Sequence, residues 1–335
     1  MIAVTNGTPI SITGLGCHVP DRVVTNDELA KLVDTSDEWI RTRTGIRERR
    51  YAADDEALSD IVLPAARAAL EQARVRARDL DLIIVATVTP DMMFPSTAAI
   101  IADKLGSSEA AAYDLSAGCT GFMYGIAQAA GMLAAGLSRR SLVVGADVLS
   151  KVMNFADRST CVLFGDGAGA VVMEPVAAEG FLGFELGADG AGGVDLQMPA
   201  GGSRLPTSAE TVAGGLHYVQ MNGRQVYKFA TRVLVSSAES LLAKTGVAIE
   251  DVDVYVPHQA NVRIIDHAVV KLGIPEEKVV VNVDRYGNTS SASIPLALAE
   301  AVGDGRVQKG SIVLMTGMGA GLTWGSALMR WTEAA

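Results

Sequence analysis

The sequence predicts an α/β protein made of two similar halves. β-rich runs alternate with helical runs along the whole chain, which is the pattern of α/β folds. At 335 residues the chain is too long for one ordinary core and suits two units of about 150 residues each. Segments of the first half also recur in the second half at a nearly constant distance.

The expected elements follow one another in chain order. Runs rich in aliphatic residues are expected to be strands: residues 80–88, 111–117, 141–148 and 170–176 in the first half, and 252–258, 278–283 and 311–317 in the second. Helices are expected after two of these strands: residues 96–106 and 260–273. A third helix is expected to begin at Cys119, because Gly118 turns the chain after the strand at 111–117.

The uncharged run of residues 115–138 has two possible interpretations. About 20 apolar residues can cross a bilayer. This run, however, is rich in glycine and alanine and contains Ser116, Thr120 and Gln128. A helix buried so deeply that it needs no polar face explains this composition better. We therefore expect no membrane insertion.

The repeat aligns the segment around Cys119 with the segment around Asn288. Gly118 and Cys119 correspond to Gly287 and Asn288, at a distance of 169 residues. Two further pairs keep nearly that distance: residues 104–106 with 271–273, and Ser141 with Ser311. We expect the halves to pack about a pseudo-twofold axis, with equivalent helices starting at Cys119 and Asn288 side by side in the middle.

The boundary between the halves is expected near residues 174–180. The N-terminal half, residues 1–176, then carries the candidate nucleophile, and the C-terminal half, residues 177–335, carries the candidate histidine and asparagine. Residues 187–215 cluster glycine and show little periodicity, so we expect a long excursion over the surface.

Two glycine-rich loops, residues 165–170 and 317–321, partly match dinucleotide-binding patterns. Neither opens a helix, and the sequence GxxxxGK[ST] does not occur. We expect tight turns beside the active site instead. The sequence predicts no cofactor and no metal site.

The composition restricts the partners and the compartment. A net charge of −10 argues against broad binding to nucleic acid or anionic membranes. Three scattered cysteines suit a reducing compartment without a disulfide framework. The first ten residues lack the basic and apolar regions of a signal peptide. These features predict a cytoplasmic protein.

Cys119 is the candidate nucleophile. A thiol at a helix N-terminus meets unpaired N–H groups and the positive end of the helix dipole, worth about 1–2 kcal/mol when partly buried. This predicts a thiol pKa about one below its usual value of about 8.5. The alternative, a small buried hydrophobic residue, is what we expect of Cys17 and Cys161.

His258 and Asn288 are expected to meet this cysteine. His258 ends a predicted strand, where open α/β sheets place their ligand sites. Asn288 would by itself suit an N-cap, but the repeat places it opposite Cys119. A nucleophile that faces two hydrogen-bond donors, one of them titratable, suits acyl transfer followed by stabilisation of an enolate.

Six segments together resemble the type III β-ketoacyl-acyl carrier protein synthases of the thiolase superfamily. They span nearly the whole chain in the family's order: residues 35–49, 116–122, 164–172, 256–264, 284–293 and 317–327. The resemblance implies a thiolase-like, five-layered αβαβα fold, usually in a homodimer. It also implies a Cys-His-Asn triad formed by Cys119, His258 and Asn288.

The resemblance further implies a two-step condensation. Cys119 takes an acyl group from acyl-coenzyme A, while its own N–H and one from the loop containing Gly319 and Ala320 hold the oxyanion. Malonyl-acyl carrier protein then loses carbon dioxide. Its enolate, held by N–H donors of His258 and Asn288, attacks the acyl-cysteine and gives the 3-oxoacyl thioester that initiates fatty acid synthesis. Coenzyme A thioester is thus a substrate.

The resemblance also implies where coenzyme A binds. Trp39 and Arg158 match residues that sandwich the adenine, Arg43 lies near the phosphates and Asn261 on the pantetheine. Met221 and Gly223 are expected in the same binding site.

Phe94 matches the residue that closes the family's acyl pocket from the partner subunit. The flexible Met92 and Met93 lie beside it. Met318 and Leu322 replace phenylalanines that are common in the family, and this departure affects the shape of the pocket. We expect a small starter such as acetyl.

A basic stripe is the candidate docking surface for the carrier protein. Arg224, Lys228 and Arg232 stand at i, i+4 and i+8, so on a helix they share one face, with no acid between residues 224 and 238. The alternative is an ordinary solvated face. The resemblance implies carrier contacts on this helix and at Arg263.

Two alternative functions remain open from the sequence. Related type III condensing enzymes of specialised metabolism use the same triad on other acyl-coenzyme A or malonyl thioesters. A non-catalytic carrier-protein-binding homologue would keep the fold and lose the activity. The intact triad argues against the second alternative.

Overall fold

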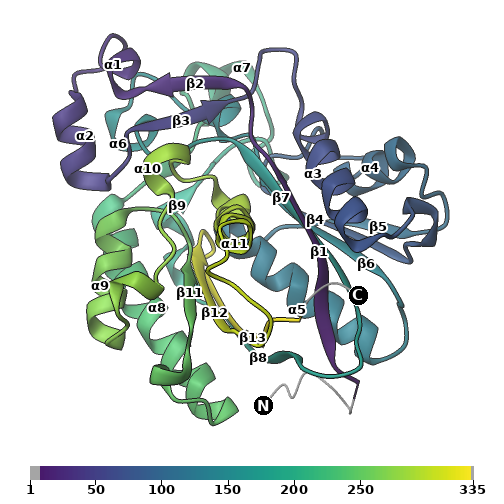
Figure 1. Ribbon diagram of the computed structural model, residues 1–335. Coiled ribbons are helices and arrows are strands. Elements are labelled where there is room, and N and C mark those ends of the chain that lie inside the picture. Colours follow the sequence, from purple (N-terminus) through teal and green to yellow (C-terminus); the bar gives the residue numbers. More distant parts are fainter. Residues whose placement is uncertain (1–7, 333–335) are drawn as a thin grey trace.

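The computed structural model describes residues 8–332 and contains two mixed β-sheets with helices on both faces of each (Figure 1). The first seven residues, part of the segment used to predict the absence of a signal peptide, lie outside the described residues. Within residues 8–332, no helix combines the length and the apolar character that a bilayer crossing requires. The predicted α/β class is confirmed.

The first sheet comes entirely from residues before the predicted boundary at 176. Its strands are β1 (Ile10–His18), β4 (Leu82–Ala86), β5 (Ala111–Leu115), β6 (Ser141–Asp147) and β7 (Gly167–Pro175). Their order is β1-β7-β6-β4-β5. The strands β5, β4 and β6 are parallel, whereas β6 pairs with β7, and β7 with β1, in antiparallel fashion.

The second sheet repeats this arrangement with one strand fewer. Its strands are β8 (Gly180–Ala188), β11 (Val254–Pro257), β12 (Ile312–Gly319) and β13 (Thr323–Arg330). The order β8-β13-β12-β11, with two antiparallel pairs and then a parallel pair, matches β1-β7-β6-β4. This shared order shows the predicted duplication.

The prediction of a strand at residues 278–283 is wrong. In the place equivalent to β5, Val279 forms a single parallel bridge with Tyr255. A 3₁₀ turn ends at Lys278 and the short helix α10 (Val283–Tyr286) begins soon after, so no longer ladder can form between them. Residues 279–282 are therefore an irregular connection that leads to Asn288.

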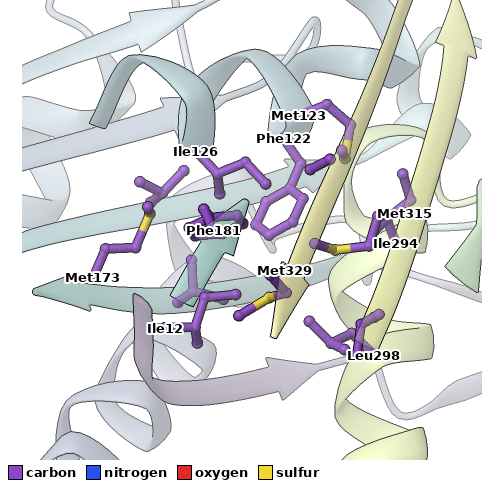
Figure 2. Close-up of a cluster of buried hydrophobic side chains, with 14 of the residues drawn as sticks. Ile12, Phe122, Met123, Ile126, Met173, Phe181, Ile294, Leu298, Met315 and Met329 are labelled. Atoms are coloured by element: carbon purple, nitrogen blue, oxygen red, sulfur yellow. The ribbon is translucent and has the colours of Figure 1, made fainter. Parts of the chain in front are cut away.

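Two helices, α5 (Gly121–Ala134) and α11 (Ser293–Gly303), form the layer between the sheets. The apolar core in Figure 2 brings Ile126 of α5 and Leu298 of α11 together with Met173 of the first sheet and Met329 of the second. Because α5 is covered on both sides, it needs no charged face. This burial explains the uncharged run in the sequence.

Four longer helices cover the outer faces of the sheets. The helices α3 (Leu58–Ala73) and α4 (Thr97–Leu105) pack on the first sheet, and α8 (Gly223–Thr245) and α9 (Val262–Leu272) pack on the second. The five-layered αβαβα arrangement is thus present. The repeated Lys-Leu-Gly segments end the equivalent helices α4 and α9, where Gly106 and Gly273 adopt left-handed φ values of 73° and 70°.

The remaining elements are short. They are α1 (Asn26–Leu29), α2 (Asp37–Thr44), α6 (Arg158–Cys161), α7 (Ala209–Ala213), β2 (Arg22–Thr25), β3 (Glu48–Tyr51), β9 (Leu196–Gln197) and β10 (Gln220–Met221). The pairs β2–β3 and β9–β10 are antiparallel. The second pair ties the glycine-rich excursion to the segment before α8.

The glycines of the 165–170 loop do not form the expected turn. Gly167 and Gly169 lie within β7, and a Cβ on Gly169 would come 2.6 Å from the side chain of Pro295. Glycine in this strand therefore allows α11 to approach the sheet closely. The prediction of a tight turn at this position is wrong.

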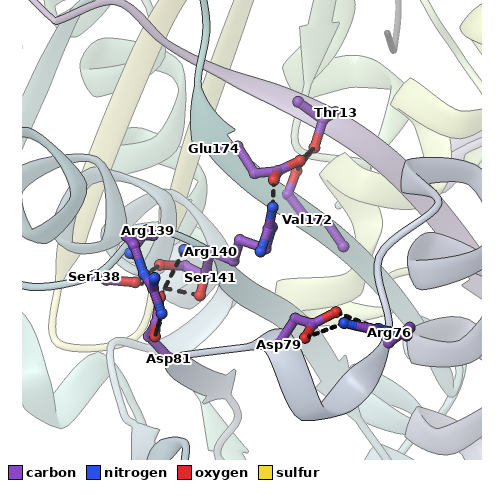
Figure 3. A network of polar contacts seen from close by, with 10 residues as sticks. All are labelled: Thr13, Arg76, Asp79, Asp81, Ser138, Arg139, Arg140, Ser141, Val172 and Glu174. Atoms are coloured by element: carbon purple, nitrogen blue, oxygen red, sulfur yellow. Dashed lines mark hydrogen bonds and ion pairs between the residues drawn. The ribbon is translucent and has the colours of Figure 1, made fainter.

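A polar network holds one end of the first sheet (Figure 3). The carboxylate of Asp81, just before β4, accepts the backbone N–H groups of Arg139 and Arg140 at 2.8 Å and 3.1 Å. Arg140 pairs with Glu174 of β7 at 2.8 Å, and Glu174 accepts the hydroxyl of Thr13 of β1 at 2.8 Å. These contacts join four neighbouring strands at the ends where β4 and β6 begin. The opposite ends carry the candidate site.

Candidate active site

Cys119 lies in a 3₁₀ turn, Gly118–Thr120, that leads directly into α5. Gly118 has a φ of 57°, and a Cβ there would come 2.7 Å from backbone atoms of Ala320. Only glycine combines this backbone conformation with so close an approach. The turn thus holds Cys119, 9% exposed, against the loop between β12 and β13.

Two backbone N–H groups converge on the sulfur of Cys119. One is its own N–H and the other belongs to Ala320. A Cβ on Gly319 would collide with the backbone nitrogen of Cys119, so glycine allows this loop to lie so near. Because the donor at 320 is a backbone group, alanine can supply it as well as glycine. Such a pair of donors can stabilise the oxyanion of a tetrahedral intermediate.

The sequence-based prediction of a lowered thiol pKa is wrong. Burial raises the pKa of Cys119 to about 11, and hydrogen bonds from Ser290, from its own N–H and from Ala320 offset only part of this effect. The charge of Asp147 also raises the pKa. Cys119 is therefore a thiol at neutral pH, and the donors around it are available to an oxyanion.

His258 follows β11 and is 1% exposed. Its N–H donates to the carbonyl of Thr316 at 2.8 Å, which fixes the backbone. The ring atom Nδ1 lies 2.5 Å from Oγ of Ser293, whereas Nε2 is buried and has no hydrogen-bond partner in the part of the chain that the structure describes. Burial lowers the pKa of His258 to about 3, so the ring is neutral at physiological pH.

Asn288 lies five residues before α11, so the prediction that it opens the helix is wrong. Its N–H donates to the carbonyl of Leu163 at 2.8 Å, and Oδ1 accepts the N–H of Ser290 at 2.8 Å. No hydrogen bond within residues 8–332 uses Nδ2, so the amide presents a donor to the cavity. The preceding Gly287 has a φ of 63°, close to that of Gly118 in the first half.

Asp147 joins the two halves beside the site. It ends β6 and is fully buried. One carboxylate oxygen accepts the hydroxyls of Thr87 and Thr89 and the N–H of Val88, at 2.8–3.1 Å. The other oxygen accepts the hydroxyl of Ser291 at 2.9 Å and its N–H at 3.3 Å. This carboxylate therefore ties the segment after Asn288 to the first sheet.

Two cavities meet at Cys119. The first is mainly apolar; its lining includes Val88, Leu149, Val152, Leu196, Met198 and Val219. The second also contains His258 and Asn288; its lining further includes Met221, Gly223, Tyr227 and Asn261. The structure thus brings the three predicted catalytic residues to one cavity from different elements. A buried nucleophile where an apolar pocket meets a second channel that carries a few polar side chains suits transfer of an acyl group.

Comparisons with known proteins agree with this geometry. The 3-oxoacyl-[acyl-carrier-protein] synthase III model matches residues 113–190, and its C-terminal model matches residues 242–331. The β-ketoacyl-[acyl-carrier-protein] synthase III of Symbiobacterium thermophilum is 58% identical over 96% of this chain and 98% of its own. The chain belongs to the β-ketoacyl-[acyl-carrier-protein] synthase III family.

Solved structures of the synthase III family have the same fold. The Thermus thermophilus enzyme superposes with a TM-score of 0.91 at 49% identity, covering 97% of this chain and all of that one. A priming β-ketosynthase of the R1128 polyketide pathway superposes with a TM-score of 0.90 at 38% identity, covering 98% of this chain and 97% of that one.

In this synthase III chain, the residues expected at the coenzyme A mouth lie together. The guanidinium carbons of Arg43 and Arg158 are 5.0 Å and 4.7 Å from the centre of the Trp39 ring. Nδ2 of Asn261 donates to the carbonyl of Arg43 at 3.1 Å, and Asn261 also lines the second cavity. These contacts connect the surface at Trp39 with the channel. Arg158 lies over the Trp39 ring, where the resemblance predicts that adenine binds.

The candidate gate lies away from the cavities of its own chain. Phe94 is 85% exposed and lines neither cavity at Cys119. Met318 lines the second cavity, and Leu322 is buried in the core beside α8. Closure of the acyl pocket by Phe94 therefore stays a prediction that requires a second copy of the chain.

Sequence reasoning missed Leu196 and Met198. Both line the apolar cavity, so the prediction of a surface excursion over residues 187–215 is wrong at this point. The pairing of β9 with β10 returns the chain to the site. The sequence does alternate here, because apolar Leu196 and Met198 flank polar Gln197. Three residues are too few to predict a strand.

The predicted docking residues lie on α8 and α9. Arg224 and Lys228 are exposed on the first turns of α8, beside Tyr227 of the second cavity. The guanidinium carbon of Arg263 is 5.8 Å from the centre of the Tyr227 ring. Arg232 lies further along α8 and lines a separate hollow that also contains acidic side chains. Three of the four bases therefore lie next to residues that line the second cavity.

Proposed function

We propose that this member of the synthase III family condenses a short acyl-coenzyme A with malonyl-acyl carrier protein. The product is a 3-oxoacyl-acyl carrier protein, which initiates fatty acid synthesis. The observation that carries this proposal is the meeting of Cys119, His258 and Asn288 at one cavity. The names of the relatives in Symbiobacterium and Thermus agree with it.

The first half-reaction is acyl transfer to Cys119. The sulfur attacks the thioester carbonyl, and the N–H groups of Cys119 and Ala320 stabilise the resulting oxyanion. The bond to the coenzyme A sulfur then breaks. The proton of the Cys119 thiol passes to the sulfur of coenzyme A. The step therefore releases coenzyme A as a thiol and needs no other proton.

The second half-reaction uses the side-chain donors. Malonyl-acyl carrier protein loses carbon dioxide, and the electron pair of the broken bond forms an enolate. Within residues 8–332, Nε2 of His258 and Nδ2 of Asn288 have no partner, and both can donate to the enolate oxygen. The enolate carbon attacks the acyl carbonyl, and the Cys119 thiolate leaves and takes up a proton.

The apolar cavity supports a short, uncharged starter such as acetyl. Val88, Leu149 and Val152 line it and offer no partner to a charged group. Met93 and Phe94 are 76% and 85% exposed, a pair of large apolar side chains that a second subunit would cover. We place Phe94 at the acyl pocket of the partner in a homodimer.

Three surface bases support recognition of an acidic carrier protein. Arg224, Lys228 and Arg263 lie where the phosphopantetheine arm would enter the second cavity. In a chain of net charge −10, this local basic surface would steer the carrier to the mouth. The coenzyme A substrate and the free cysteines suit a cytoplasmic location.

The half-reactions can be tested separately. The protein is mixed with acetyl-, butyryl- and isobutyryl-coenzyme A, and its intact mass is measured. Malonyl-acyl carrier protein or malonyl-coenzyme A is then added, and the product is identified. Cys119→Ala is the control, since it removes the nucleophile but only one buried sulfur from the fold.

We expect acylation of Cys119, strongest with the smallest starter, and product only with the carrier-bound malonyl group. Absence of an acyl-enzyme, or acylation of the Cys119→Ala variant, would contradict the proposed reaction. Equal use of malonyl-coenzyme A would indicate a condensing enzyme of another pathway.

A further inference from the structure

We propose that the hydroxyl of Ser293 holds His258 in the tautomer whose proton is on Nε2, so that the ring enters the condensation as a hydrogen-bond donor. This inference rests on the proposed function, in which His258 stabilises the malonyl-derived enolate. Ser293 is the first residue of α11, and its side chain contacts no part of either cavity at Cys119. It is therefore a positioning residue.

The hydrogen bonds around Ser293 determine which atom donates. Its oxygen already accepts the backbone N–H of Gln259 at 3.3 Å. Oγ is also 2.5 Å from Nδ1 of His258. Within residues 8–332, no other hydrogen bond involves this hydroxyl, and Ser293 is 1% exposed. Its proton therefore has one acceptor, which is Nδ1.

The opposite tautomer leaves two groups unsatisfied. If Nδ1 carried the proton, the hydroxyl of Ser293 would accept from both His258 and Gln259 and would keep a buried proton without an acceptor. Nε2, which is buried and has no partner among the described residues, would then direct a lone pair at the enolate oxygen. Two electron-rich atoms would face each other where the proposed reaction requires attraction.

The same arrangement exists at Asn288. Its Oδ1 accepts the N–H of Ser290, so the amide directs Nδ2 into the cavity. Residues 290–293 thus occupy the acceptor atom of both side chains and leave a donor on each. The segment Ser-Ser-Ala-Ser orients the two donors in the same way.

The first experiment measures the tautomer directly. In protein labelled with ¹⁵N-histidine, the spectra that correlate ring nitrogens with ring protons distinguish a protonated nitrogen from an unprotonated one. Comparison with a His258→Gln variant assigns the signals among the four histidines. We expect Nε2 to be protonated and Nδ1 unprotonated at pH 7. A protonated Nδ1 would overturn the proposal, whether or not the variants fold.

The second experiment uses Ser293→Ala and Ser293→Thr. In Ser293→Ala, we expect a mixture of tautomers and a loss of about tenfold or more in the condensation step, with acylation of Cys119 changed less than twofold. Ser293→Thr keeps the hydroxyl and should restore the parent spectrum and most of the rate. Ser237→Ala is the matched control, because it removes another buried hydroxyl, bonded to Ser326 at 2.8 Å, away from both cavities.

The outcomes separate the two proposals. A parent protein that forms no acyl-enzyme refutes the proposed function and leaves the spectrum of His258 to decide the tautomer. Normal condensation in Ser293→Ala with the parent tautomer refutes the role of Ser293 and leaves the function standing. An equal loss in Ser237→Ala would also refute it, because the effect would then be one of general packing.

Discussion

The helices α5 and α11 occupy equivalent places between the two sheets, but the segments that lead into them differ in chemistry. Before α5, the chain presents the thiol and the backbone N–H of Cys119, and Ala320 of the loop between β12 and β13 adds a second backbone donor. Before α11, it presents the amide of Asn288 and three serines that bond to neighbouring groups. One copy of the repeat thus carries the nucleophile, while the other carries polar side chains that orient donors.

This difference shows how a duplicated backbone can divide a reaction. The glycines before Cys119 and Asn288 have nearly the same φ, 57° and 63°, so the two turns bring different side chains to one point. Around the sulfur, the backbone N–H groups of Cys119 and Ala320 can bind an oxyanion without a special side chain. The second half must fix the direction of side-chain donors, and serine hydroxyls and N–H groups do so.

The largest expected effect separates the two halves by reaction step. In Asn288→Ala, we expect acylation of Cys119 to persist while condensation falls by roughly 10² or more, since one donor to the enolate is lost. Intact mass after mixing with acetyl-coenzyme A measures the first step, and product formed from malonyl-acyl carrier protein measures the second. Equal losses in both steps would contradict the conclusion that Asn288 acts in condensation and not in acylation.

The second prediction concerns the contact that joins the halves. Asp147→Ala leaves several buried donors from both halves without their acceptor, so the free energy of unfolding should fall by about 3 kcal/mol or more. Urea unfolding followed by circular dichroism measures this change. Asp81→Ala is the control at the other end of the same sheet. Its carboxylate is partly exposed, so we expect a loss of about 1 kcal/mol. Similar losses in both variants would show that Asp147 does not specially join the halves.

The third prediction tests whether backbone donors alone make Cys119 a thiolate. Because burial raises its pKa to about 11, the thiol form predominates below that pH. The rate of alkylation by iodoacetamide should therefore rise about tenfold per pH unit between pH 7 and 10. Cys119→Ala provides the background from Cys17 and Cys161. A rate that levels off below pH 9 would mean that the helix end outweighs burial.

The raised pKa has a second consequence, for stability. The folded protein holds the Cys119 proton more tightly than the unfolded chain, whose thiol has a pKa of about 8.5. The contribution of this group to folding is therefore complete below pH 8.5 and is lost as the pH rises toward 11. Unfolding of parent and Cys119→Ala across this range measures the difference.

The smallest expected effect concerns recognition by the second half. Lys228→Ala with Arg263→Ala should raise the KM for malonyl-acyl carrier protein several-fold, and added salt should narrow the gap from the parent, because surface charges act mainly on association. Acyl transfer from acetyl-coenzyme A should hardly change. Lys271→Ala with Lys309→Ala is the control, since it removes the same charge near the end of α9 and before β12, away from the channel. An unchanged KM at low salt would mean that Lys228 and Arg263 are ordinary solvated surface residues with no part in carrier recognition.

Much of the fold could be predicted because its signals are local. Alternating runs indicated the α/β class, and the repeated Lys-Leu-Gly and glycine turns indicated the duplication. The strand β1 was missed because Gly14 and Gly16 interrupt its pattern. A Cβ at either position would collide with the backbone of α3, so these glycines reflect packing between distant segments.

The candidate site was predictable to a similar degree. Cys119, His258 and Asn288 stand at strand ends and turns that the sequence marks, and the repeat relates two of them. The position of Leu196 and Met198 depends on how a long excursion returns to the cavity at Cys119. The pKa of Cys119 depends on burial by segments from both halves, which no local pattern expresses.

Arg43 and Arg158, which stack on Trp39, determine what an adenine ring would have to displace in order to bind there. Arg158 lies over Trp39 and is anchored by a 2.7 Å hydrogen bond to the carbonyl of Asp34, so the indole is already shielded from water in the free protein. If the adenine of coenzyme A stacks on Trp39, it must displace a cation or slide beneath it. Binding would then be an exchange of one stacked partner for another. The affinity gained at this position would be the difference between the adenine–indole contact and the arginine–indole contact that it replaces. In the free protein, the side chain of Arg158 would protect the Trp39 ring until a ligand arrives.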